Sequence, residues 1–411
     1  MRTMFRAVHA ARLDRLFVAH AQSALGTGAG YVVLLLVVYE RFDTAWALSV
    51  ILLAGFLPSM LLGPLLGAAV DRWPRRRCAI AADLLRATAF VGMGVIDSLA
   101  GMTLFALIAG AGESLFRPAI LAGIADAASD EDGQLAPVTS LYSAIEELGV
   151  TLGPALAGVA LIFIDPVGVL LFNGLTFGVS ALLLVGVDLD RHPKGERKGL
   201  ERPSLFAATG ESFRAMRDMT RVNAVILASS LALGFAAMIN VAEVLLAKET
   251  LGAGDSGFSA LVAVFGVGIV IGAALVSRVR AGAEMRLFLG GILLFGLATV
   301  GSGLATVLGV ALVTFTIAGC GDGLEGVSGR LILQRDVPRD LQGRVFAVKE
   351  TAGSWGFGLA FIGGGALASL LEPGQVFVIA GVGAILVSLA TALVLRRRAP
   401  GPGPVGGTEP A

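Results

Sequence analysis

The sequence predicts an all-α membrane protein of twelve transmembrane helices, arranged as two pseudo-symmetric halves of six helices each. Three observations carry this prediction: long apolar runs, the placement of basic residues between them, and a weak internal repeat. The chain of 411 residues is 55% apolar and 15% charged, whereas soluble domains carry about 25% charged residues. The apolar runs approach the ~20 residues that a helix needs to cross a bilayer, and they are too long for barrel strands.

The apolar runs place the spans at 16–39, 45–70, 78–96, 102–125, 138–163, 167–187, 224–248, 257–277, 287–304, 307–334, 345–370 and 375–395. The boundary between the spans 287–304 and 307–334, at a turn near Gly301 and Thr306, is the least distinct, because few polar residues separate these two apolar runs. The 56 glycines suit such a bundle, since small residues let membrane helices approach closely.

Basic residues set the orientation. Most of the 31 Lys and Arg lie at the two ends of the chain and in alternate loops, whereas the intervening loops carry only Arg41 and Lys248. Because loops rich in Lys and Arg stay in the cytoplasm, both termini are predicted to be cytoplasmic. Arginine far outnumbers lysine, as in proteins of GC-rich bacteria, so the predicted location is the bacterial cytoplasmic (inner) membrane.

A long polar segment divides the chain near its middle. Residues 188–223 form a predicted cytoplasmic linker between an N-terminal half, 1–187, and a C-terminal half, 224–395. The simplest interpretation of the linker is a solvated basic loop, and its part 204–221 is a candidate for a helix lying on the membrane. Residues 396–411 are rich in Pro and Gly, which predicts a disordered cytoplasmic tail.

Two short strings recur at an offset close to half the chain. Gly67–Arg72 resembles Gly272–Arg278, and Ala109–Glu113 resembles Ala318–Asp322. Six helices per copy is an even number, so the two copies keep the same orientation in the membrane. This predicts a parallel repeat about an axis along the membrane normal.

The loop after the second span combines a glycine, an acid and a basic cluster. Its residues are Gly67, Asp71, Arg72, Arg75, Arg76 and Arg77. With this spacing the chain resembles the major facilitator superfamily. The resemblance implies an alternating-access transporter in which Asp71 latches one half against the helix that starts near Arg344 and Val345 in the other, a contact worth about 0.3–2 kcal/mol. A plain basic cytoplasmic loop is the alternative.

The same resemblance implies a charge network at the cytoplasmic side. Asp83 and Arg86 share a face of the third span, and Asp126 ends the fourth span on the same side of the membrane. In the family such groups switch between conformational states and do not contact substrate.

The fifth span carries a proline among spaced glycines: Gly149, Gly153, Pro154 and Gly158. Proline removes a backbone donor and bends a helix, and the glycines permit close packing. The pattern resembles the antiporter motif of facilitator exporters. A packed and kinked helix without further function is the alternative.

Further strings resemble one branch of the superfamily, that of macrolide-efflux and enterobactin exporters, which are drug:proton antiporters. The strings are 116–119, 140–158, 333–338 and 342–346.

Ionisable side chains inside spans are the candidate functional residues, because a charge at the bilayer centre costs at least about 2.5–3.5 kcal/mol. In the family the first, fourth, seventh and tenth helices line a central cavity. The resemblance therefore places Gln22, Glu113, Arg117, Asn240, Glu243, Asp322 and Glu325 around one cavity.

The spacing of these residues suggests their roles. Glu113 and Arg117 are four residues apart with the acid first, which favours an ion pair; this pair could be purely structural. Asp322 and Glu325 share a helix face, and two poorly hydrated acids side by side bind protons more readily than isolated ones. Glu146 is a second proton candidate.

The sequence has no nucleotide-binding loop, nucleophile–base constellation or metal-ligand cluster, which predicts that the protein is not an enzyme. We expect no cofactor, no metal and no nucleic-acid partner, but a small-molecule substrate, a lipid bilayer, a proton gradient as the energy source, and a monomer. The predicted function is proton-coupled efflux of amphipathic drug-like molecules. A dedicated exporter or flippase of a metabolite such as a siderophore or lysolipid, and a non-transporting membrane sensor on the same scaffold, are the alternatives.

Overall fold

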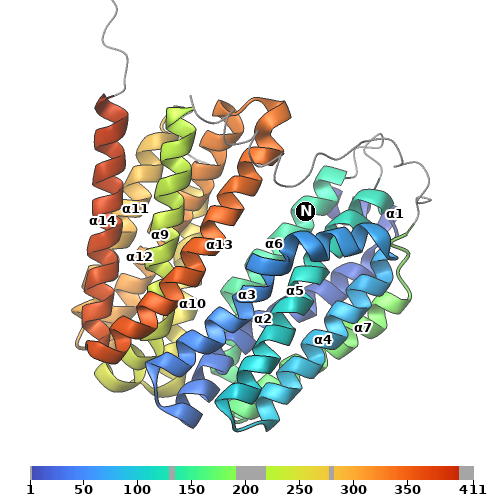
Figure 1. Cartoon of the computed structure of the whole chain (residues 1–411), viewed down its shortest axis with the longest axis horizontal. Helices are drawn as coiled ribbons and strands as arrows, with labels where there is room; N and C mark the ends of the chain where they lie inside the picture. Colours follow the sequence, from blue (N-terminus) through green and yellow to red (C-terminus); the bar gives the residue numbers. More distant parts are fainter. Residues whose placement is uncertain (1, 129–134, 191–218, 277–281, 398–411) are drawn as a thin grey trace, which may run out of the picture.

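The computed structural model describes residues 2–128, 135–190, 219–276 and 282–397, and every regular element in these ranges is a helix (Figure 1). The first half contains α1 (Arg2–Ala10), α2 (Asp14–Phe42), α3 (Ala45–Arg72), α4 (Arg75–Val95), α5 (Leu99–Ala127), α6 (Leu135–Ala160) and α7 (Pro166–Val185). The second half contains α9 (Thr220–Leu245), its π-helical extension η1 (Leu246–Thr250), α10 (Gly254–Val276), α11 (Glu284–Gly303), α12 (Leu308–Asp336), α13 (Arg339–Leu370) and α14 (Pro373–Arg397).

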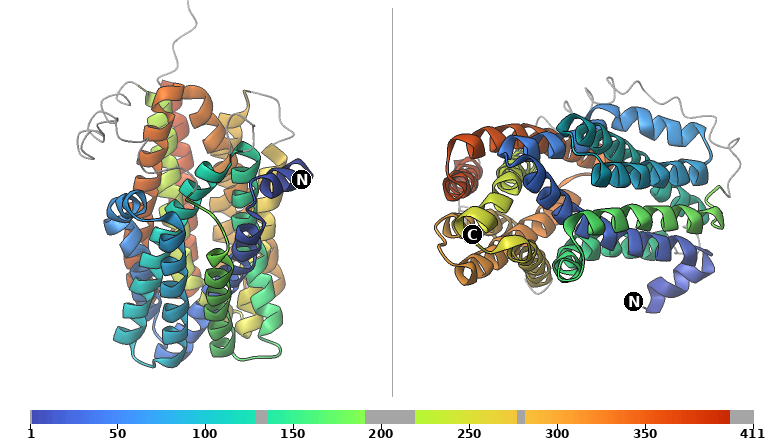
Figure 2. Two further views of the ribbon diagram at one scale, coloured as in Figure 1. Left: turned by 90° about the vertical axis from the view of Figure 1, so that its right-hand side faces the viewer. Right: turned by 90° about the horizontal axis from the view of Figure 1, so that it is seen from below.

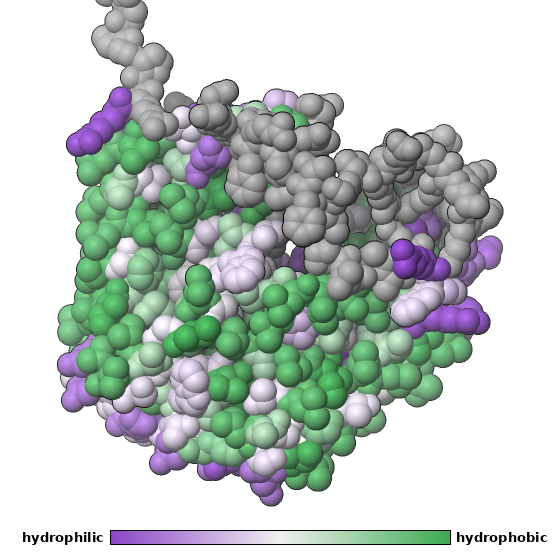
Figure 3. Space-filling model, in the orientation of Figure 1, coloured by the Kyte–Doolittle hydropathy of each residue, from purple (hydrophilic) through white to green (hydrophobic). Residues whose placement is uncertain are grey.

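Eleven helices of the described residues are long and apolar enough to cross a membrane, and each overlaps one predicted span. The remaining predicted span, 138–163, forms α6, whose 26 residues extend about 39 Å. The turn predicted after Gly301 is present, since α11 ends at Gly303 and α12 begins at Leu308. The short helix α1 was not predicted. Apolar residues cover much of the molecule in Figure 3, and hydrophilic ones lie toward its lower edge and at its upper margins.

The same helix contacts recur in the two halves. In the first half α2 packs on α6 and α7, α4 on α5 and α7, and α3 on α5; in the second, α9 packs on α13 and α14, α11 on α12 and α14, and α10 on α12. The two groups of helices lie side by side in Figure 1 and Figure 2. The helices thus repeat in the order that the internal sequence repeat predicts.

The repeated glycine strings make equivalent close contacts. A Cβ added to Gly110 of α5 would lie 2.1 Å from the carbonyl oxygen of Gly55 in α3. A Cβ added to Gly319 of α12 would lie 2.0 Å from the carbonyl oxygen of Phe265 in α10. Only glycine allows backbones to approach this closely, so each half is a tightly packed bundle.

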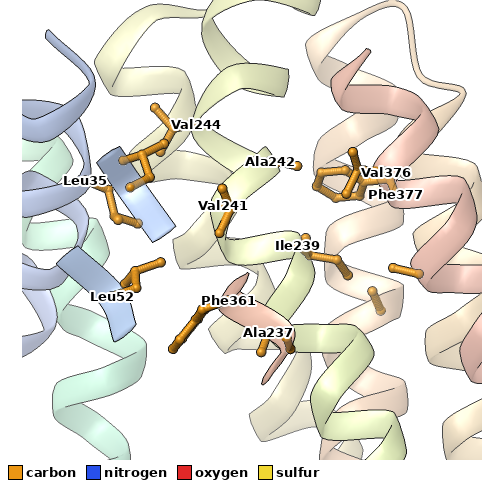
Figure 4. Close-up of a cluster of buried hydrophobic side chains, with 14 of the residues drawn as sticks. Leu35, Leu52, Ala237, Ile239, Val241, Ala242, Val244, Phe361, Val376 and Phe377 are labelled. Atoms are coloured by element: carbon orange, nitrogen blue, oxygen red, sulfur yellow. The ribbon is translucent and has the colours of Figure 1, made fainter. Parts of the chain in front are cut away.

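The halves join mainly at the end away from the chain termini. One apolar cluster includes Leu35 and Leu52 of the first half and Val241, Val244 and Phe361 of the second, which face one another in Figure 4. At the end that holds the N-terminus, the buried cluster described there draws all its residues from the first half. Among the described residues, the apolar seal between the halves therefore lies at the end away from the chain termini.

Polar contacts accompany the apolar seal. The hydroxyl of Tyr39 in α2 donates to Glu249 of η1 across 2.8 Å, and the ammonium of Lys248 lies 3.3 Å from Glu40 of α2. Lys248 also pairs with Asp255 of α10 at 2.8 Å. Two of these contacts cross between the halves.

Candidate functional site

A cavity of about 550 Å³ lies between the two halves. Its wall draws on helices of both halves and contains many aromatic side chains, among them Tyr31, Phe56, Tyr142, Phe265, Phe315 and Phe357. The volume is typical of a small-molecule site, and such sites combine apolar walls with a few polar groups. The sequence alone did not identify these aromatic residues.

Most of the predicted cavity residues line this space. Glu113, Glu146, Asn240, Glu243 and Asp322 belong to its wall. A second cavity of about 370 Å³ adjoins it and includes Arg117, Asp322 and Glu325. Because Asp322 belongs to both walls, it stands where the two spaces meet.

The prediction for Gln22 was wrong. Its side-chain amide donates to the carbonyl oxygens of Ala19, at 3.0 Å, and Thr176 in α7, at 2.8 Å. It belongs to neither cavity wall. The physical reason is that α2 packs on α7 as well as on α6, so this face of α2 is turned toward a neighbouring helix.

The predicted ion pair between Glu113 and Arg117 is also absent from the described contacts. Glu113 instead accepts a 2.7 Å hydrogen bond from Arg86 of α4, while Arg117 lies 3.7 Å from Glu146 of α6. Neighbouring helices present better-placed partners than the same helix does. The acid of Glu113 remains half exposed to the cavity, with 53% of its side chain accessible.

Asp83 and Arg86 form a buried network that differs from the predicted one. The Asp83 carboxylate is fully buried, pairs with Arg86, and accepts a 2.7 Å hydrogen bond from Ser180. The rings of Phe116 and Phe177 lie 4.0 and 4.4 Å from the Arg86 guanidinium, close enough for cation–π attraction.

In the described contacts this network is joined to Glu113, whereas Asp126 pairs with Arg75, and Arg86 lines the larger cavity. The prediction that Asp83, Arg86 and Asp126 form one group differs from the described contacts, while their predicted role in switching between conformational states stays a prediction.

Asp126 belongs to a separate cluster at the end that holds the N-terminus. It forms an ion pair with Arg75, whose guanidinium also donates to the carbonyl of Ala122 at 2.7 Å. The backbone amide of Arg75 donates to Asp190 at 2.7 Å. This cluster fastens the start of α4 to the end of α5 and to the segment after α7.

The other predicted residues of the loop after the second span are described in less detail. Arg72, Arg76 and Arg77 are exposed. The structure does not describe the burial of Gly67 or the side chains of Asp71 and Arg344. The predicted latch stays a prediction.

The glycines of α6 contact two different helices. A Cβ on Gly149 would lie 2.6 Å from the carbonyl oxygen of Ala24, and one on Gly153 would lie 2.5 Å from the Cα of Gly28, both in α2. Gly158 faces Ser259 of α10 in the other half, at 3.1 Å by the same measure. Pro154 lines the larger cavity within an uninterrupted helix. The motif thus packs α6 inside its own half and also against the other half.

The acid pair of α12 lies where the two cavities meet. Glu325 accepts a 2.5 Å hydrogen bond from Ser229 of α9. Asp322 has no hydrogen bond or ion pair among the described residues. An unneutralised acid facing a cavity can bind a proton or a cation.

Two cavity residues were missed by the sequence analysis. The ring of His20 stacks on Tyr142 with centroids 4.1 Å apart, and both residues line the larger cavity. Its Nε2 atom is buried without a hydrogen-bond partner among the described residues. Lys349 of α13 lines the smaller cavity. Both are ionisable residues within predicted spans, which is the same signal that identified the other candidates.

Two similar helical bundles around a central cavity, built from membrane-spanning helices, define a multi-pass membrane transporter. The chain belongs to the major facilitator superfamily, whose sequence model matches residues 16–348 and 225–411.

Three bacterial relatives are transporters by name. YfiS of Bacillus subtilis (strain 168), an uncharacterized transporter of the superfamily type, is 25% identical over 364 residues, covering 87% of each chain. BacE of Bacillus amyloliquefaciens, a proposed bacilysin exporter, is 25% identical and covers 91% of this chain and 92% of its own. The multidrug efflux pump Tap of Mycobacterium tuberculosis (strain ATCC 25618 / H37Rv) is 26% identical over 182 residues, covering 42% of this chain and 43% of its own. The chain therefore resembles the efflux branch.

Solved structures share the fold. A POT family transporter in complex with 5-aminolevulinic acid superposes with a TM-score of 0.76 at 13% identity, covering 94% of this chain and 96% of its own. At this identity the likeness concerns the fold alone.

Proposed function

We propose that the protein exports amphipathic, drug-like small molecules from a bacterial cell in exchange for protons. The observation that carries the proposal is the cavity between the halves, which combines aromatic walls with the acids Glu113, Glu146, Glu243 and Asp322. Aromatic walls bind apolar molecules of varied shape. Acids in the same space can release a proton as substrate enters, which couples the two movements. The efflux relatives support export as the direction.

The proposed membrane is the bacterial cytoplasmic membrane, with both termini in the cytoplasm, because the basic loops favour that orientation. With the seal away from the termini, the described conformation then opens inward. Alternating access would move the seal to the other end and expose the cavity to the outside.

The test is transport into inverted membrane vesicles with ethidium, a fluorescent amphipathic cation. We expect ethidium to accumulate when the vesicle lumen is acidic and to stay out when an ionophore collapses the pH gradient. The Asp322→Asn variant should lose gradient-driven uptake while its thermal unfolding is unchanged. Uptake that ignores the gradient would reject proton coupling, and full uptake by Asp322→Asn would remove Asp322 from the mechanism.

A dedicated metabolite exporter is the second candidate. Arg117 and Lys349 line the smaller cavity, and cations are of little use for binding a purely cationic drug. In that case ethidium would not be transported, while a compound carrying an anionic group would be.

A further inference from the structure

The smaller cavity differs in chemistry from the larger one. Its wall includes two cations, Arg117 and Lys349, and two acids, Asp322 and Glu325, so its formal charges balance. It also carries serine hydroxyls from α9 and other helices, including Ser229 and Ser230. The larger cavity is mainly apolar and its charges are mostly acidic.

In the described contacts no ion pair joins the charges of the smaller cavity to one another. Among the described residues, Lys349 forms no ion pair within 4.0 Å, and the one described partner of Arg117 is Glu146 at 3.7 Å. Neither cation lies within ion-pair distance of Asp322 or Glu325 in the described contacts. Charges in a half-enclosed site are costly unless they are paired, so both signs are available to a ligand.

A buried hydroxyl also indicates that the smaller cavity binds a polar ligand. The Ser230 oxygen is buried and has no hydrogen-bond partner among the described residues. Buried polar groups in folded proteins are nearly always satisfied. A ligand with its own hydrogen-bonding groups would satisfy this hydroxyl.

The two cavities are continuous around an aromatic wall. Phe56, Leu233, Phe295, Asp322 and Phe357 belong to both linings. The rings of Phe56 in α3 and Phe357 in α13 stack with centroids 5.0 Å apart. A ligand with a polar head in the smaller cavity would therefore place an apolar body against these rings.

We propose that the smaller cavity is a head-group subsite for zwitterionic substrates, which carry an ammonium and a carboxylate on an aromatic or apolar body. The ammonium binds Asp322 and Glu325, and the carboxylate binds Lys349 and Arg117. This inference rests on the proposed transport function, because it names the substrate class of the same site.

The test measures equilibrium binding to the purified protein in lipid nanodiscs, without any gradient. The probes are four forms of one molecule: the dipeptide Phe-Phe, its N-acetyl derivative, its C-terminal amide, and the doubly blocked N-acetyl amide. They share two aromatic rings and differ in head-group charge. The zwitterion should bind about ten-fold more tightly than either singly blocked form, because each blocking removes charge-assisted hydrogen bonds.

Variants of the cavity residues test which charge of the ligand each residue binds. Lys349→Met should weaken the preference for Phe-Phe over its amide, since the carboxylate keeps only Arg117 as a partner, while preference for the free ammonium persists. Glu325→Gln should weaken the preference for the free ammonium and retain that for the carboxylate. Arg286→Met is the matched control, because Arg286 is an exposed cation of α11 outside both cavity walls, and its binding should equal that of the unmodified protein.

Equal binding of all four forms, absence of binding by all four at millimolar concentration, or an unchanged preference in Lys349→Met would overturn the subsite. These outcomes are distinct from failure of proton-coupled efflux, because the ethidium assay is scored separately. Ethidium transport with no head-group preference rejects only the subsite. Zwitterion binding without gradient-driven transport rejects only the coupling.

Discussion

The guanidinium of Arg86 on α4 donates a 2.7 Å hydrogen bond to Glu113 on α5. The same guanidinium pairs with Asp83 one turn earlier in its own helix. One cation thus connects an acid that faces the cavity with an acid that is fully buried behind it. A change of charge at Glu113 would therefore directly alter the packing between α4 and α5.

Removing this cation should destabilise the first half. In Arg86→Met the carboxylate of Asp83, fully buried in the structure, would lose its charged partner. Breaking a buried pair costs about 3–5 kcal/mol, so we expect a large fall in the thermal unfolding temperature of the purified protein. The double variant Asp83→Asn with Arg86→Met should recover part of the loss. Arg117→Met serves as control, because that side chain is 58% exposed and its ion pair is long. Equal stability of Arg86→Met and the unmodified protein would contradict a structural role for the network.

Neutralising Glu113 should separate folding from coupling. Glu113→Gln keeps an oxygen that accepts from Arg86, and Arg86 keeps Asp83, so the unfolding temperature should change little. A glutamine cannot exchange a proton, so proton movement driven by added ethidium should be lost in vesicles loaded with a pH-sensitive dye. Glu372→Gln changes an exposed acid between α13 and α14 that lies outside both cavity walls and should behave like the unmodified protein. Normal proton movement in Glu113→Gln would exclude Glu113 as a coupling residue.

A methyl group at Gly153 should push α6 away from α2. The added Cβ would lie 2.5 Å from the Cα of Gly28 and 2.6 Å from the amide nitrogen of Ala29, and backbone atoms cannot move aside as a flexible side chain can. Overpacking costs about 1–3 kcal/mol, which should appear as a lower unfolding temperature and weaker transport of Gly153→Ala. Gly178→Ala in α7 is the control, because no heavy atom lies within 4 Å of its added Cβ. That change should be neutral or stabilising by about 0.5–1 kcal/mol. Similar stability losses in the two variants would mean that close helix contact is not the reason for glycine at 153.

Lys248 should hold the sealed end closed. Its ammonium bridges Glu40 of one half and Asp255 of the other, and only 16% of its side chain is exposed. Loss of about 1 kcal/mol would shift the balance between states roughly five-fold. We expect Lys248→Met to speed labelling of a cysteine introduced at Leu233, by an impermeant thiol reagent added on the side away from the termini, in a background with Cys78 and Cys320 replaced by serine. Lys248→Arg should label at the original rate. If Lys248→Met labels no faster than Lys248→Arg, the ion pairs do not hold the seal.

The spans were predictable because each is a long apolar run, a signal that does not depend on the neighbours of a helix. Partners of ionisable residues were harder to predict. Spacing within one helix suggested Arg117 for Glu113, but the structure supplies Arg86 from the adjacent helix. The direction in which a side chain points within a bundle is also hidden from sequence, because every face of these helices is largely apolar. Gln22 therefore seemed a cavity residue although it binds α7.

Other features left weak signals in the sequence. The repeated glycine strings predicted equivalent helices, and Gly110 and Gly319 make matching contacts. The aromatic wall of the larger cavity left no signal in the sequence, because its residues come from helices far apart in the chain. Lys349 and His20 became recognisable as cavity residues when the helices were assembled.

The apolar seal between the halves also has a thermal consequence. Moving it aside would bring Leu35, Leu52, Val241 and Val244 into contact with incoming water. Attraction between apolar surfaces weakens on cooling, whereas the strength of ion pairs depends on temperature in a different way. The resting preference of this transporter for one orientation should therefore relax in the cold, so that more of its copies would be open to the opposite side at low temperature.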